Sequence, residues 1–73
     1  MYMPTYAEAL ELKKYLADRK LEYVHFHDQC GSQFFSFDRY DEESARAAER
    51  FWMEKGLRVS FTGDGLRFIV TEG

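Results

Sequence analysis

Three residues with ligand or nucleophile chemistry lie close together in the sequence, at His25, His27 and Cys30. Alternate residues of a strand point to the same face, so an extended conformation places the two imidazoles side by side, roughly 6 to 7 Å apart by the strand rise. Imidazole nitrogens and thiolates are ligands that zinc prefers. Cys30 or the carboxylate of Asp28 could add a third ligand. The stretch is therefore a candidate metal site.

A plainer interpretation of these residues is favoured. A structural zinc site needs four ligands, and the sequence holds no second ligand cluster. Solvent-facing histidines beside a small thiol are the commoner arrangement. A Cys–His nucleophile would also need an orienting group and an oxyanion site, and so short a chain has no second domain to form a cleft. The sequence thus predicts a protein that is not an enzyme and has no cofactor, with metal binding at His25, His27 and Cys30 as a minor alternative.

The composition bounds the class of protein. The 73 residues are enough for one domain, residues 1–73, and the single cysteine excludes an intrachain disulfide. Seven Phe, five Tyr and one Trp supply large buried areas, and self-association is another source of stability for a small chain. The net charge of −3 disfavours binding driven by nucleic-acid phosphates. Neither a signal peptide nor a membrane span is predicted, so we expect a soluble, cytoplasmic protein.

Two helices are predicted from capping signals and apolar spacing. Thr5 and Glu8 have the spacing of a capping box, and the helix that follows is expected to end near Lys20. Asp41 can cap a second helix, which Gly56 would end in a left-handed conformation. The expected buried stripes are Ala9, Leu12 and Leu16 on the first helix, and Ala45, Ala48 and Trp52 on the second. Trp52 is expected to be the main anchor of the second helix.

Four strands are predicted from residues that alternate in polarity. The first begins after Leu21 and leads to a turn of about five residues over 28–32, with Gly31 at positive φ. The others are expected over 33–37, 58–61 and 66–70, the last two joined at Gly63 and Asp64. The face expected to be buried by the helices carries Val24, Phe26, Phe35, Phe37, Val59, Phe61, Leu66, Phe68 and Val70.

The two halves of the chain, about 5–38 and 41–71, resemble each other. At an offset of 36 residues Leu16 matches Trp52 and Leu21 matches Leu57, which indicates a duplicated αββ unit. A right-handed crossover between the halves predicts an α+β two-layer sandwich. Its four-stranded antiparallel sheet has order 1-2-4-3, a circularly permuted ferredoxin-like arrangement with both helices on one face. Strands two and four, apolar on both sides, are expected to be central.

The other face of this sheet would be left open, and it is the predicted binding surface. Its residues are Tyr23, His25, His27, Phe34, Ser36, Arg58, Ser60, Arg67 and Ile69. Uncovered apolar patches usually mark the binding site of a partner, and Tyr, Phe and Arg are enriched at protein interfaces. The favoured hypothesis is therefore a regulatory module that binds a protein partner or forms a homodimer through this face.

Single-stranded nucleic acid is the main alternative partner, because aromatics and Arg on an open sheet can stack on bases. The run from Cys30 to Phe37 resembles the RNP1 motif of RNA-recognition (RRM) domains in its glycine and its aromatic positions. It departs from that motif at Cys30, where a basic residue belongs, and at Ser32, where a stacking aromatic belongs. The resemblance implies binding on the sheet face at Phe34.

Overall fold

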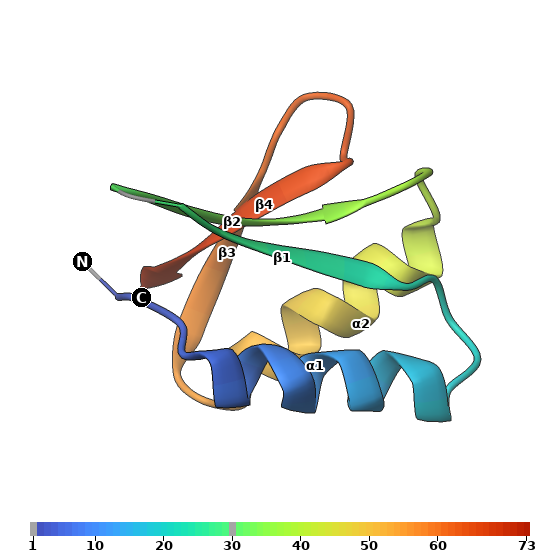
Figure 1. Cartoon of the computed structure of the whole chain (residues 1–73). Helices are drawn as coiled ribbons and strands as arrows, with labels where there is room; N and C mark the ends of the chain where they lie inside the picture. Colours follow the sequence, from blue (N-terminus) through green and yellow to red (C-terminus); the bar gives the residue numbers. More distant parts are fainter. Residues whose placement is uncertain (1, 30) are drawn as a thin grey trace.

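Two helices lie on one face of a four-stranded antiparallel sheet (Figure 1). The computed structural model describes residues 2–29 and 31–73. The elements in chain order are α1 (Tyr6–Asp18), β1 (Val24–Gln29), β2 (Ser32–Phe37), α2 (Glu42–Met53), β3 (Leu57–Phe61) and β4 (Arg67–Glu72). The strand order is β1-β2-β4-β3, so the predicted α+β sandwich with strands two and four at its centre is confirmed.

Both helix starts are capped as predicted. The Glu8 N–H donates to Thr5 Oγ1 at 3.1 Å, and the Thr5 N–H donates back to the Glu8 carboxylate at 3.0 Å. Asp41 accepts from both the hydroxyl and the N–H of Ser44, and these bonds lower the pKa of its carboxyl group. The buried Ser44 hydroxyl also accepts from the Glu22 N–H at 3.0 Å, which ties the start of α2 to the segment before β1.

Each helix is followed by a residue in the left-handed conformation, and these two residues are separated by the predicted offset of 36. Lys20 follows α1 with φ of 59°, and Gly56 follows α2 with φ of 81°. The left-handed conformation expected at Gly56 is thus present in both halves, and in the first half it falls on a lysine. The helix itself stops at Asp18, two residues before its expected end. This repeated ending supports the duplicated αββ unit.

The core lies between the helices and the sheet. Leu12, Leu16 and Trp52 from the helices meet Phe35 and Phe68 from the two central strands, and all are essentially inaccessible. Of the nine residues predicted for the covered face, Val24, Phe35, Phe37, Phe68 and Val70 are buried; Phe26, Val59, Phe61 and Leu66 are partly buried. The Phe35 and Phe68 rings stack with centroids 5.0 Å apart and planes inclined by 12°, which joins the two central strands.

Both hairpin turns differ from their predicted form. Gln29 pairs with Ser32, so the first turn is shorter than five residues; Gly31 has the expected positive φ, and Cys30 lies outside the described residues. In the second turn the positive φ falls on Gly65. Asp64 accepts from the Thr62 hydroxyl and the Leu66 N–H, and this local turn delays the start of β4 to Arg67.

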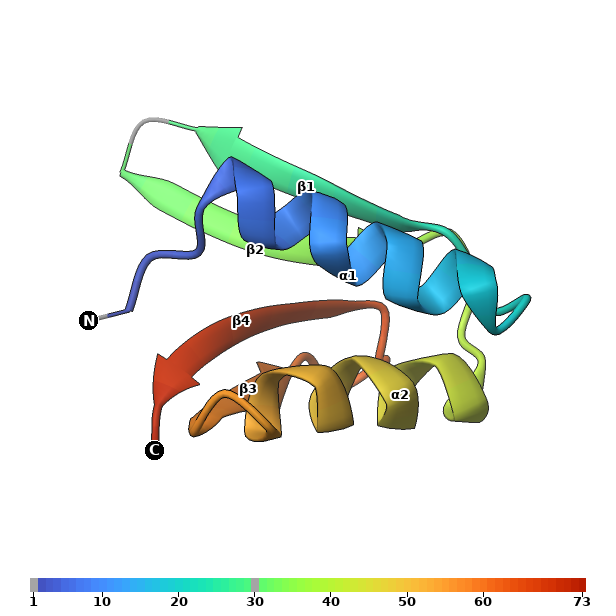
Figure 2. The same cartoon turned by 90° about the horizontal axis from the view of Figure 1, so that it is seen from below.

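The central strands β2 and β4 are paired at one end only. Their register places Phe35 opposite Phe68 and Ser36 opposite Arg67, and the Phe37 N–H donates to the Leu66 carbonyl at 2.8 Å. Beyond Phe35 the two strands diverge, and the segment before α1 lies beside their separated ends, on the side of the helices (Figures 1 and 2). We call the β2–β4 boundary the seam. Its closed end lies at residues 35–37 and 66–68, and its open end at residues 32–34 and 69–71.

Candidate functional site

The strand residues predicted for the open face share one side of the sheet. The pairs His25–Ser36, His27–Phe34, Ser36–Arg67 and Ser60–Ile69 are direct cross-strand neighbours. Neither helix covers them, since both helices lie on the opposite side (Figure 1). Ile69 is 45% exposed and Phe34 is partly exposed. The structure thus brings together a continuous surface of the residue types that the sequence indicated.

Tyr23 departs from its expected place on the first strand. It precedes β1, which begins at Val24. Its ring lies edge-on to His25 with centroids 4.9 Å apart, and its hydroxyl accepts from Lys13 Nζ of α1 at 2.8 Å. Because β1 is an edge strand, Tyr23 lies at the rim of the open face, 57% exposed, between the sheet and the helix layer.

Phe34 lies at the centre of a row of side chains that crosses three strands. The His27 ring stacks on it with centroids 4.3 Å apart and planes inclined by 12°. Arg67 approaches from β4, with its guanidinium carbon 5.5 Å from the Phe34 centroid. Since β2 lies between β1 and β4, these neighbours approach from opposite sides. Both faces of the Phe34 ring therefore have a neighbour within the protein.

Each histidine has a hydrogen-bond partner of its own. His25 Nε2 lies 3.0 Å from Asp38 Oδ1, and His27 Nε2 lies 2.8 Å from Ser36 Oγ. Asp38 and Lys13 were not among the site residues predicted from the sequence. The β1–β2 register offered a signal for Asp38, because extending it by one position places Asp38 opposite Tyr23, diagonal to His25.

The candidate metal site remains a prediction, because Cys30 lies outside the described residues. The two imidazole centroids are 6.4 Å apart, in agreement with the spacing expected for a strand. Within residues 2–29 and 31–73, no three His, Cys, Asp or Glu side chains gather as a metal site would require. Asp38 adds a carboxylate beside His25 only.

Charge is unevenly distributed over the molecule. The chain carries −3 in total. Yet no Asp or Glu is found at the described strand positions that point to the open face, where Arg58, Arg67 and two imidazoles lie. Asp38 and Asp64 border this face from loops. Hydrogen bonds from Thr62 and Leu66 lower the pKa of the Asp64 carboxyl group. The strand positions of the open face thus carry two arginines and no carboxylate, within an acidic protein.

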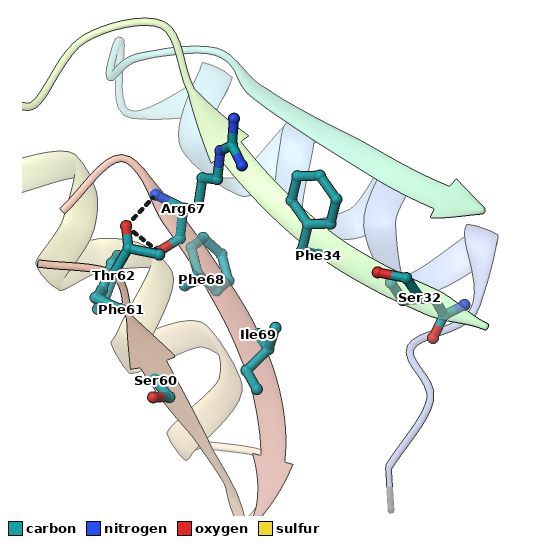
Figure 3. Close-up of a pocket in the computed structure, with 9 residues that line it drawn as sticks. Ser32, Phe34, Ser60, Phe61, Thr62, Arg67, Phe68 and Ile69 are labelled. Carbon is teal, nitrogen blue, oxygen red and sulfur yellow. Dashed lines mark hydrogen bonds between the residues drawn. The ribbon is translucent and has the colours of Figure 1, made fainter. Parts of the chain in front are cut away.

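A cavity of about 430 Å³ hollows the open face beside β4 (Figure 3). Phe34 lines one side and Ile69 the other, with Arg67 and Ser60 nearby. A second cavity, of about 560 Å³, lies at the open end of the seam. It is lined by Tyr2, Met3, Pro4, Gly31, Ser32, Gln33, Phe35, Ile69, Val70, Thr71 and Glu72. The sequence did not indicate either cavity.

Comparisons with protein-family models, with curated proteins and with solved structures found no match to the chain. Across the described part of the chain, neither helix has the length and apolarity needed to cross a membrane. The functional inference below therefore depends on the open face alone.

Proposed function

We propose that the chain is a small, non-enzymatic protein-binding module whose open sheet face holds a protein partner. The observation that carries this proposal is a sheet face with partly exposed Phe34 and exposed Ile69, uncovered by either helix. Uncovered apolar side chains surrounded by polar groups are typical of interaction surfaces. Arg, Phe and Tyr are residue types that interfaces favour.

The charge of the open face indicates which partner fits. Arg58 and Arg67 lie among apolar and imidazole groups with no carboxylate at the strand positions of this face. A partner with acidic side chains around an apolar centre would satisfy both features, and electrostatic complementarity would speed its association. A homodimer that joined two open faces would bring like charges together, which costs free energy. A different protein is therefore the favoured occupant, and a second copy is an outcome of the test.

Single-stranded nucleic acid is the second candidate, supported by the row of His27, Phe34 and Arg67. Bases stack on the flat face of an exposed aromatic ring. Here His27 is stacked on Phe34 at 4.3 Å and Arg67 lies on its other side, so a base would have to displace one of them. This cost, together with the acidic net charge, places nucleic acid below a protein partner.

The test compares two substitutions of exposed or partly exposed apolar residues on opposite layers. Phe34→Glu places a negative charge on the open face, while Leu10→Glu places one on α1, where Leu10 is 47% exposed. Each protein is used to capture partners from lysate of the native host. Candidates are then purified and titrated directly by calorimetry. We expect a partner whose purified form binds wild type and Leu10→Glu equally, and whose affinity falls at least tenfold with Phe34→Glu.

Equal binding by Phe34→Glu and wild type would place the interface elsewhere and overturn the proposal. Sedimentation of the purified chain tests self-association. A dimer that Phe34→Glu dissociates would keep the open face as an interface, with a second copy as its occupant. Binding to single-stranded oligonucleotides that weakens with salt and with Arg67→Ala would instead support the nucleic-acid candidate.

A further inference from the structure

At the open end of the seam, the described residues form no backbone hydrogen bonds between β2 and β4. The Phe37 N–H donates to Leu66 across the seam. Backbone groups of every second residue point to the same side of a strand, so those of Gln33 also point toward β4. By the same alternation, the groups of Val70 point toward β2. In a continued ladder Gln33 and Val70 would form the next hydrogen-bonded pair, but the described pairing stops at Phe35 and Phe68.

The opposite edge of each strand pairs with another strand. On β2, the alternation that points Gln33 to β4 points the backbone groups of Ser32 and Phe34 to β1. On β4, the Arg67 carbonyl accepts from the Thr62 N–H at 2.9 Å, so alternate residues of β4 bond to β3 and the intervening ones face β2. The unpaired groups of Gln33 and Val70 therefore face each other across the open end. Unpaired strand edges are templates for another extended chain.

Two cavities adjoin this opening, and they share Ser32, Gln33 and Ile69 in their linings. Phe34 and Arg67, on the open face, line the first cavity (Figure 3). Phe35 and Val70, whose side chains point to the helix layer, line the second. Successive side chains of a strand point to opposite faces. One extended segment could thus place neighbouring side chains in the two cavities.

We propose that the open end of the seam binds an extended peptide segment of the partner protein by strand addition. Its backbone hydrogen-bonds to the unpaired groups of Gln33 and Val70. An apolar side chain enters the helix-side cavity beside Phe35, and the next side chain, an Asp or Glu, meets Arg67 in the open-face cavity. The inference rests on the proposed function, because the open-face cavity is part of the open face, and it adds the conformation and side-chain pattern of the partner.

The charge of Arg67 supports the presence of an Asp or Glu side chain of the peptide in the open-face cavity. Arg67 lines the open-face cavity and forms no ion pair among the described residues; its carbonyl and N–H are engaged with Thr62. Arg58 points to the same face from β3 but does not line either cavity. The pair therefore offers a matched control, since only Arg67 can meet a side chain bound in the cavity.

The probe is a displayed library of random linear peptides, selected on the wild-type protein. We expect the recovered peptides to alternate apolar residues with Asp or Glu. A synthetic peptide of the recovered sequence should slow hydrogen exchange at the amides of Gln33 and Val70, because both become hydrogen-bonded. N-methylation of the peptide nitrogens that face the seam should abolish binding. Arg67→Glu should weaken binding roughly tenfold or more, while Arg58→Glu should have a much smaller effect.

Recovered peptides without alternation, no recovered binder, or unchanged exchange at Gln33 and Val70 would each overturn the inference. Equal effects of Arg67→Glu and Arg58→Glu would contradict the placement of an Asp or Glu side chain of the peptide beside Arg67. The outcome for the proposed function can be distinguished from the outcome for strand addition. A purified partner that binds wild type, loses affinity with Phe34→Glu and leaves both amides unprotected would retain the open-face interface and exclude strand addition.

Discussion

The two ends of the seam between β2 and β4 differ in whether the strands pair. At the closed end Phe35 stacks on Phe68, and the strands are held by direct backbone bonds. At the open end the polar Gln33 donates its side-chain amide to the Pro4 carbonyl and to Asp28, away from β4. Aromatic burial thus joins the two hairpins at one end, and the other end is where we propose that a peptide binds. The proposal therefore assigns stability and binding to different ends of a single strand boundary.

The largest expected effect comes from breaking the closed end. Phe68 is 1% exposed and contacts Phe35, Phe37 and Phe61, so Phe68→Ala should lower the free energy of unfolding by about 3–5 kcal/mol. The next residue, Ile69, is 45% exposed on the open face, and Ile69→Ala should cost less than about 1 kcal/mol. Urea denaturation of both variants checks the difference. Similar losses would show that the two faces contribute equally to stability.

An intermediate effect is expected from the turn beside the closed end. Gly65 has φ of 72°, and a Cβ there would lie 2.7 Å from Tyr40 Cδ1. Gly65→Ala should therefore cost about 2–3 kcal/mol, from the left-handed backbone and from displacement of the Tyr40 ring. Gly31, at the open end, has φ of 77° and no atom within 4 Å of the added Cβ. Gly31→Ala should cost only the backbone part, about 1–2 kcal/mol.

Thermal unfolding of the two glycine variants separates the cost of the left-handed backbone from the cost of displacing the Tyr40 ring. Adding Tyr40→Ala should recover part of the loss in Gly65→Ala, because the ring that collides is removed. The same addition to Gly31→Ala should recover nothing. If the two glycine variants lose equal stability, the collision with the Tyr40 ring adds nothing to the cost at residue 65.

The smallest effect concerns Tyr2, which lines the cavity at the open end. A hydrogen bond to the Glu8 carboxylate raises the pKa of the Tyr2 phenol to about 12, with burial and the Glu8 charge acting in the same direction. The raised pKa means that the protonated phenol stabilises the folded state. This contribution is complete below the ordinary value of 10.0 and is lost as the pH rises toward 12.

Phenolate absorbance measures this ionisation directly. The wild-type chain should show a component from Tyr2 that ionises late, and Tyr2→Phe should remove that component. Tyr6→Phe is the matched control, since Tyr6 is 70% exposed and should leave the late component unchanged. A wild-type titration without a late component would contradict the Tyr2–Glu8 bond.

Local features of this fold could be predicted from the sequence, because local chemistry determines them. The caps at Thr5 and Asp41 need only residues within one helical turn. The left-handed position at Gly56 was predicted from its residue type, whereas the one at Lys20 was not predicted. The two faces of the sheet follow from the alternation of side chains, which requires no knowledge of strand pairing.

The open end of the seam could not be predicted, because it depends on how two hairpins meet. Alternation assigns Gln33 and Val70 to a ladder position, but only the divergence of β2 from β4 leaves them unpaired. The covered faces of the Phe34 ring likewise depend on rotamers of His27 and Arg67 from two other strands. Asp38 lies in a loop that the strand pattern did not include. In each case the decisive contact joins distant parts of the sequence.

The single tryptophan provides an optical probe of the molecule. Trp52 is fully buried, and its indole nitrogen has no hydrogen-bond partner among the described residues. Its neighbours are the rings of Tyr2, Phe35 and Phe51. An indole in such apolar surroundings should emit at short wavelength and shift to the red on unfolding. Because Tyr2 and Phe35 also line the cavity at the open end, a peptide that enters there should change the emission of Trp52 without any added label.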